Sequence, residues 1–139
     1  MTPALPDGAS FLRSSLRANA TFSALSGTLF TVAGAEIARF LSVAPMLVVL
    51  TGVNLLGFAA ALWYFAGRPA LSRPIALLIV AADLLWVVGT VALVRLEVFH
   101  GNGAIAALGV SAVVLLFALL QFIGTRQLAP RSLHAERHA

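Results

Sequence analysis

Two residues inside a long apolar run, Asp83 and Trp86, have side chains that could do chemistry. They stand in the stretch AADLLWVVG, residues 81–89. A carboxyl group takes up and releases protons, whereas an indole N–H donates a hydrogen bond and accepts none. Their i, i+3 spacing places both side chains on one face of a helix. The pattern indicates a site for a proton or a ligand in apolar surroundings.

An acid in an apolar helix has three interpretations, and the sequence leaves them open. Asp83 can join helices through hydrogen bonds and so fix their register. It can be a protonatable group in a transport pathway. It can also form a ligand or lipid site together with Trp86. All three require Asp83 to face the interior, because a carboxyl group facing lipid costs about 3 kcal/mol.

The composition is that of a membrane protein. Of the 139 residues, 60% are hydrophobic and 10% are charged, and the mean hydropathy is +0.99. In soluble domains about a quarter of the residues are charged. The sequence has no cysteine and no lysine, which excludes thiolate chemistry and an imine-linked chromophore. We expect one integral membrane domain, residues 1–139.

Four stretches each reach the roughly 20 residues that a helix needs to cross a bilayer. Turn-forming residues separate them at 42–45, 67–74 and 100–103. Connections this short favour consecutive helices that are antiparallel neighbours. The predicted fold class is therefore all-α, a four-helix transmembrane bundle of up-down-up-down topology. Its predicted spans are residues 18–38, 46–66, 75–94 and 104–124.

The first span is the weakest, since it carries several hydroxyl groups and Glu36. Arg13 and Arg17, a short apolar core and the small residues at 33–35 are also typical of a cleaved signal peptide. Apolar residues continue beyond Glu36, which favours a retained helix over cleavage.

The arginines predict the orientation in the membrane. Seven fall on the side of the two termini and two on the opposite side, so both termini and a short tail, residues 125–139, are expected in the cytoplasm. The same bias argues against insertion in both orientations. The seven are Arg13, Arg17, Arg68, Arg73, Arg126, Arg131 and Arg137, and the two are Arg39 and Arg95.

Residue counts along the spans predict which polar groups meet. Asp83 and Asn54 are each ninth in their span, so both lie near the midplane, roughly 6 Å apart along the membrane normal. Ser26 falls at about the depth of Asp83. We therefore expect a neutral Asp83 to donate a hydrogen bond to Asn54 or Ser26. The predicted ligand or proton site consists of Asp83, Asn54, Trp86 and Ser26.

A second polar layer is predicted near the cytoplasmic face. Asn19 opens the first span and Gln121 lies near the end of the last, so both fall within about 5 Å of that boundary. Asn19, Ser23 and Ser26 are spaced i, i+4, i+7 and share one helix face. This face would connect the two layers.

The sequence predicts no catalytic residue, metal or cofactor. It has no Ser/His/Asp arrangement, no phosphate loop and no paired carboxylates within a span, so we do not expect an enzyme. His134 and His138 are spaced i, i+4 in the tail, but two ligands make a poor metal site. The arginines are scattered rather than clustered, which argues against a nucleic-acid partner.

Three segments carry a resemblance to known proteins: LRANATFSALSG at 16–27, ADLLWVVG at 82–89 and LLQFIG at 119–124. They resemble a group of small bacterial four-span integral membrane proteins without an established activity. The resemblance implies a multi-pass protein of the bacterial inner membrane. Small multidrug transporters are of similar size and span number, but their embedded acid is a glutamate in the first helix, where this chain has Asn19.

These features favour a non-enzymatic structural or accessory protein with a polar interior around Asp83. Its expected partners are membrane lipid and either a second copy of the chain or another membrane protein. The alternative is a small proton-coupled transporter, or a ligand- or lipid-binding protein, that uses Asp83, Asn54 and Trp86. The spans contain no proline and no convincing internal symmetry, which favours the structural role.

Overall fold

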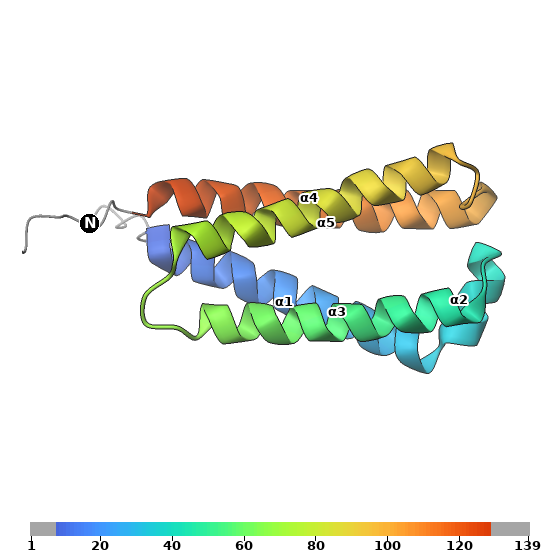
Figure 1. The fold of residues 1–139 in the computed structure, drawn as a ribbon, viewed down its shortest axis with the longest axis horizontal. Helices are drawn as coiled ribbons and strands as arrows, with labels where there is room; N and C mark the ends of the chain where they lie inside the picture. The colour runs from blue at the N-terminus through green and yellow to red at the C-terminus, as the bar shows by residue number, and fades with distance from the viewer. Residues whose placement is uncertain (1–7, 129–139) are drawn as a thin grey trace, which may run out of the picture.

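The structure is a computed structural model that describes residues 8–128, and every regular element in this range is an α-helix (Figure 1). Four long helices lie side by side, each antiparallel to the next long helix, and a short helix crosses one end. We call the end where the first helix begins the terminal end, and the other the α2 end. The helices are α1 (Gly8–Val32), α2 (Gly34–Leu41), α3 (Pro45–Ala66), α4 (Arg73–Arg95) and α5 (Gly101–Gln127).

Three of the helices, α3, α4 and α5, are each long and apolar enough to cross a membrane. The pair α1 and α2 meets the same criteria together, with a bend of 91° between the two helices. The surface is correspondingly apolar, since Leu78, Leu85 and Ile105 are 69%, 73% and 71% exposed. Such a surface is stable in lipid rather than in water. The chain is a multi-pass membrane protein.

The predicted span boundaries hold for three helices and fail for the first. Residues 46–66, 75–94 and 104–124 each lie wholly inside α3, α4 or α5. The prediction of one helix over residues 18–38 is wrong, because α1 begins at Gly8 and ends at Val32. The predicted tail also begins too early, since α5 continues to Gln127; residues 129–139 lie outside the described range.

The helix α1 begins early because its first turns bury an apolar face. Leu12, Leu16 and Ala20 follow one another at intervals of four residues and are almost fully buried. They form one core cluster with residues of α3 and α4, including Leu62 and Ala76. The sequence before residue 18 thus belongs to the packed core near the terminal end.

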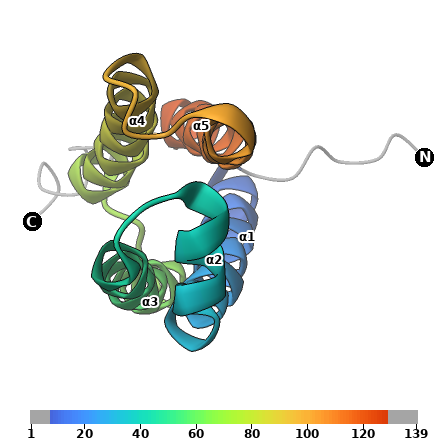
Figure 2. The ribbon, with the colours of Figure 1, turned by 90° about the vertical axis from the view of Figure 1, so that its right-hand side faces the viewer.

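The chain bends at Ala33, so α2 lies across the α2 end instead of continuing α1 (Figure 2). Gly34 packs tightly against α3, where a Cβ would lie 2.7 Å from a methyl carbon of Val49. The helix α2 ends at Leu41, and the next residue, Ser42, has a left-handed φ of 57°. Pro45 then opens α3, at a position where a helix needs no backbone N–H.

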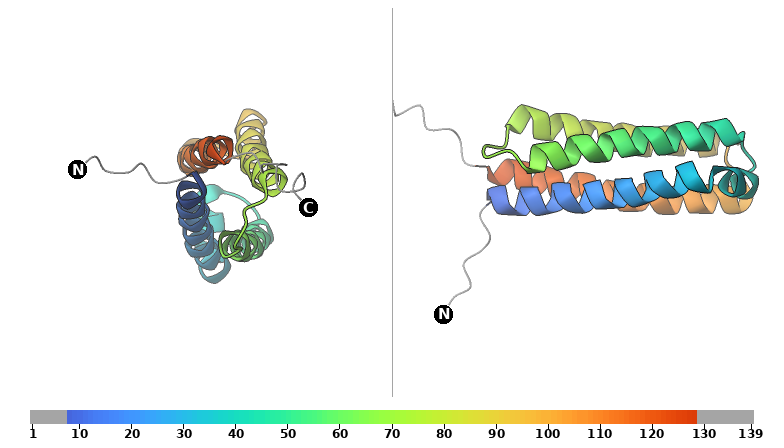
Figure 3. Two further views of the ribbon diagram at one scale, coloured as in Figure 1. Left: turned by 90° about the vertical axis from the view of Figure 1, so that its left-hand side faces the viewer. Right: turned by 90° about the horizontal axis from the view of Figure 1, so that it is seen from below.

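Glycine brings α1 close to both of its long neighbours, α3 and α5 (Figure 3). A Cβ on Gly27 would lie 2.8 Å from the carbonyl oxygen of Gly52 in α3. A Cβ on Gly124 of α5 would lie 3.0 Å from the Cα of Leu12. Small residues at such contacts allow helix backbones to approach closely.

The helices α3 and α4 are antiparallel, as the short connection predicted, but their backbones do not approach closely (Figure 1). Within residues 8–128, no Cα atom of α3 lies within 8 Å of one in α4, although only residues 67–72 connect the two helices. Phe58 and Phe65 of α3 and Ile75 of α4 pack against the core cluster, so large side chains rather than close backbones make up this part of the core.

Candidate functional site

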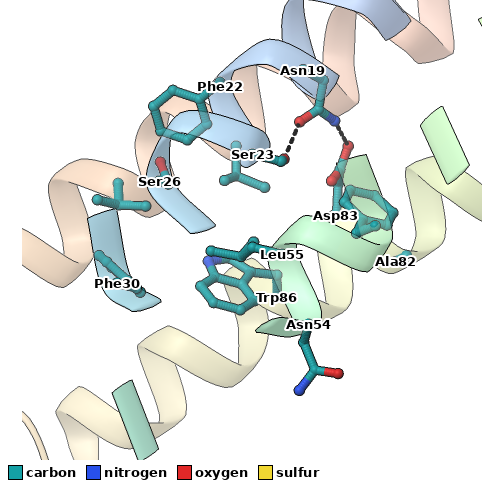
Figure 4. Close-up of a pocket in the computed structure, with 13 residues that line it drawn as sticks. Asn19, Phe22, Ser23, Ser26, Phe30, Asn54, Leu55, Ala82, Asp83 and Trp86 are labelled. Carbon is teal, nitrogen blue, oxygen red and sulfur yellow. Dashed lines mark hydrogen bonds between the residues drawn. The ribbon is translucent and has the colours of Figure 1, made fainter. Parts of the chain in front are cut away.

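Asp83 accepts hydrogen bonds from two other helices. Its Oδ2 accepts one from Asn19 Nδ2 of α1 at 2.8 Å and one from Gln121 Nε2 of α5 at 3.2 Å. Ser23 donates to Asn19 Oδ1 at 3.2 Å, as Figure 4 shows beside the Asn19–Asp83 bond. Asn19, Asp83 and Gln121 are at most 3% exposed. We call these three residues the triad; they join α1, α4 and α5.

These are not the partners that the residue counts predicted for Asp83. Asn54 is exposed and donates to Leu50 O on its own helix at 3.0 Å. Figure 4 shows its carboxamide pointing away from Asp83. Ser26 is half-buried, and the bonds that Asp83 makes to described residues do not include it. The prediction that Asn54 or Ser26 bonds to Asp83 is therefore wrong.

The predicted depth of the second polar layer is also wrong. Asn19, Ser23 and Gln121 were placed near the cytoplasmic face, but Asn19 and Gln121 contact Asp83 directly. The counts failed because α1 begins at Gly8, which puts Asn19 about 16 Å along the helix from its start. A helix that starts earlier carries its polar residues deeper.

A cavity of about 170 Å³ lies beside the triad, toward the α2 end, with walls from all four long helices (Figure 4). Asp83 and Trp86 of α4 both line it. Most of the lining is apolar, and four aromatic rings contribute to it. These belong to Phe22 and Phe30 of α1, Phe58 of α3 and Trp86.

From the exposure of its lining residues we infer that the mouth of this cavity lies between α3 and α4. Two of its lining residues, Asn54 of α3 and Ala82 of α4, are exposed on the outside of the protein. These are the two helices whose backbones stand apart. An opening between these two helices faces sideways, toward the surface that lipid covers.

Three buried polar atoms have no hydrogen-bond partner among residues 8–128: Trp86 Nε1, Ser111 Oγ and Gln121 Oε1. Figure 4 shows the Trp86 nitrogen on the side of the indole that faces α1 across the cavity. A buried donor without an acceptor costs about 1–3 kcal/mol. The hydrogen bonds to Asp83 from described residues both end on Oδ2, so they leave Oδ1 available.

The sequence predicted Trp86, but it did not indicate the three phenylalanines of the cavity or the buried Ser111. Phe22, Ser26 and Phe30 are spaced i, i+4, i+8, and this spacing could have placed two of the rings on the face of Ser26. Phe58 stands one turn after Asn54 in the same way. Ser111 gave no signal, since a single hydroxyl group in an apolar span can bond to a carbonyl oxygen of its own helix.

The arrangement can hold a proton at Asp83 and an apolar molecule with a hydrogen-bond acceptor in the cavity. Over residues 8–128, no three His, Asp or Glu residues are grouped so that they could hold a metal ion. No protein-family model, curated protein or solved structure matches the chain.

Proposed function

We propose that the chain is a four-span, four-helix bundle of the bacterial inner membrane with both termini in the cytoplasm. In this proposal α1 is the first span, and α2 lies at the outer interface. The distribution of arginine supports the orientation, because the positive-inside rule places the richer end in the cytoplasm. In the described range the terminal end has Arg13, Arg17, Arg68, Arg73 and Arg126, and the α2 end has Arg39 and Arg95.

Its proposed role is structural or accessory and non-enzymatic. The observation that carries this role is that one oxygen of Asp83 accepts both amide hydrogen bonds of the triad. No Cα atom of α1 lies within 8 Å of α4 in the described range, so the Asn19–Asp83 bond crosses the centre of the assembly. Such a bond fixes the rotation and depth of α4. The proposed partners are lipid and a second copy of the chain or another membrane protein.

Substitution of Asp83 tests this role. Asp83→Asn keeps an oxygen that accepts both bonds, so we expect the free energy of unfolding to change by less than about 0.5 kcal/mol. Asp83→Leu leaves the amides of Asn19 and Gln121 buried without an acceptor and should cost about 2–5 kcal/mol. Equilibrium unfolding in mixed micelles measures both values. Equal destabilisation by the two substitutions would contradict the proposed role.

Reporter fusions test the topology separately. In the loop at 67–72, a reporter that is active only in the cytoplasm should give a signal. In the loop at 96–100, a reporter that is active only outside the cytoplasm should give a signal. The reverse pattern would overturn the proposed orientation and leave the role of the triad unaffected.

A second candidate is a small proton-coupled transporter or ligand-binding protein, which the cavity beside Asp83 favours. The Gln121 amide nitrogen donates to a charged Asp83. After rotation of the carboxamide by half a turn, Oε1 could instead accept a hydrogen bond from a protonated Asp83, so the triad can hold either form of the carboxyl group. Infrared spectra of the carboxyl band across pH separate the candidates, with Asp83→Asn as the control. A band that titrates near neutral pH favours the transporter, and a constant band favours the structural role.

A further inference from the structure

The size of the lateral cavity suits one or two fused rings. An apolar protein cavity of about 150 Å³ binds benzene, and this cavity has about 170 Å³. The rings of Phe22, Phe30, Phe58 and Trp86 line it. Aromatic side chains pack well against other flat rings, in stacked or edge-to-face arrangements. A flat ring therefore fits the cavity better than a bulky polar headgroup does.

The unpartnered indole of Trp86 indicates which polar group the occupant carries. Nε1 is buried without a partner in the described range, and it can only donate. Nε1 has almost no accessible surface, so a ligand that supplies an acceptor oxygen would satisfy it after a small rotation of the indole. Asp83 Oδ1, one turn earlier on the same helix face, can donate to such an oxygen when it carries a proton.

Charge excludes other classes of occupant. The residues that line the cavity include no arginine, so nothing there compensates a phosphate or a carboxylate. A lipophilic cation would meet Asp83 but would give the Trp86 N–H no acceptor. A neutral carbonyl compound satisfies the donors without bringing a charge into the membrane.

The position of the mouth indicates how the occupant enters. The cavity opens between Asn54 and Ala82, on the lipid-covered side where α3 and α4 stand apart. An apolar tail attached to the ring can leave through this opening and remain in the bilayer. The ring itself then lies near the middle of α4, roughly 20 Å from the start of that helix.

We propose that this cavity binds the ring of a lipid-soluble carbonyl compound of the quinone class, with its tail extending between α3 and α4 into the bilayer. One carbonyl oxygen accepts a hydrogen bond from Trp86 Nε1, and the ring packs against the phenylalanines of α1 and α3. The inference concerns binding only. It rests on the cavity and is independent of the structural role proposed for the triad.

The first experiment is equilibrium binding of a radiolabelled decyl-substituted benzoquinone to the full chain in nanodiscs. We expect saturable binding of one molecule per chain. Trp86→Phe keeps a ring and removes the N–H, so it should weaken binding about three- to tenfold. Trp63→Phe is the matched control, because Trp63 is exposed on α3 and lies outside the cavity. It should leave the dissociation constant unchanged.

A second pair of variants tests the location of the mouth. Ala81 and Ala82 are adjacent and both exposed, but only Ala82 lines the cavity. Ala82→Phe should close the opening and reduce binding at least about tenfold, whereas Ala81→Phe should bind as the wild type does. Thermal unfolding of all variants identifies any that misfold. If Trp86→Phe misfolds, the comparison of Ala82→Phe with Ala81→Phe still tests the site.

Two competitors complete the design. Decylbenzene has the same tail and a ring without carbonyl oxygens, and it should compete at least about threefold more weakly than the quinone. Equal competition would overturn the role of Trp86 as a donor, and stronger competition by tetraphenylphosphonium would replace the carbonyl class by a cation. Non-saturable uptake, or equal binding by Ala82→Phe and Ala81→Phe, would overturn the site itself. None of these outcomes affects the unfolding test on Asp83.

Discussion

The two sides of α3 show opposite kinds of helix contact. On one side α1 approaches so closely that Gly27 and Gly52 face each other, although α2 is inserted between α1 and α3. On the other side α4 follows after only residues 67–72, yet its backbone stays away from that of α3. The size of the side chains at the contact, and not the length of the connection, decides how near two helices come.

The two sides of α3 also differ in what they contribute, since one stabilises the fold and the other leaves space for a ligand. The contact of α1 with α3 leaves no room for even a Cβ atom at Gly52. The wider boundary between α3 and α4 admits the cavity, with the unpartnered indole of Trp86 at its wall. We infer that the close side holds the protein together and the open side is available to a ligand.

Among the variants that test this contrast, the largest effect is expected from a substitution that separates α1 from α3. In Gly52→Leu the new Cβ would lie 2.6 Å from Thr31 Oγ1 and 2.8 Å from Gly27 O, so α1 must move away from α3. We expect a loss of about 3 kcal/mol of unfolding free energy, measured in mixed micelles. Gly57→Leu is the control, because a Cβ there meets no atom within 4 Å. Similar losses in both variants would refute the contrast.

A smaller effect is expected when the triad loses its α1 member. Asn19→Leu removes a bond to Asp83 and the acceptor of Ser23, and it should cost about 2 kcal/mol. Asn54→Leu removes only a bond within α3 at an exposed position, so a change within about 0.5 kcal/mol is expected. The same unfolding assay compares them. If Asn54→Leu proved the more damaging, the assignment of partners to Asp83 would have to be revised.

The smallest effect concerns the loop that joins the two helices of the open side. Arg13 donates to Ala66 O at 2.9 Å and to Pro69 O at 2.7 Å, and so ties this loop to α1. Arg13→Gln should cost about 1 kcal/mol and raise the amide hydrogen exchange of residues 67–72. Arg17→Gln, at an exposed position one turn later, should leave the exchange unchanged. Unchanged exchange in Arg13→Gln would mean that the loop holds its position without this anchor.

Much of the helical structure could be predicted from the sequence. The apolar runs of α3, α4 and α5 are continuous and long enough to span a bilayer, and both properties are local. The start of α1 was missed because Arg13 and Arg17 resemble the flanks of a span, while Leu12 and Leu16 show their burial only once α3 and α4 are in place. The bend at Ala33 likewise brings Gly34 against Val49 of α3, a contact that the local sequence does not show.

For the candidate site too, some features could be predicted from the sequence and others depend on the tertiary structure. The sequence by itself determined that Asp83 lies within an apolar helix and shares a face with Trp86, because lipid penalises a carboxyl group and helical geometry sets the spacing. Only the tertiary structure decided that Asn19 and Gln121, and not Asn54, bond to Asp83. It also decided that a cavity opens between α3 and α4. Partners depend on the rotation and axial offset of helices, which arise from contacts between segments far apart in the chain.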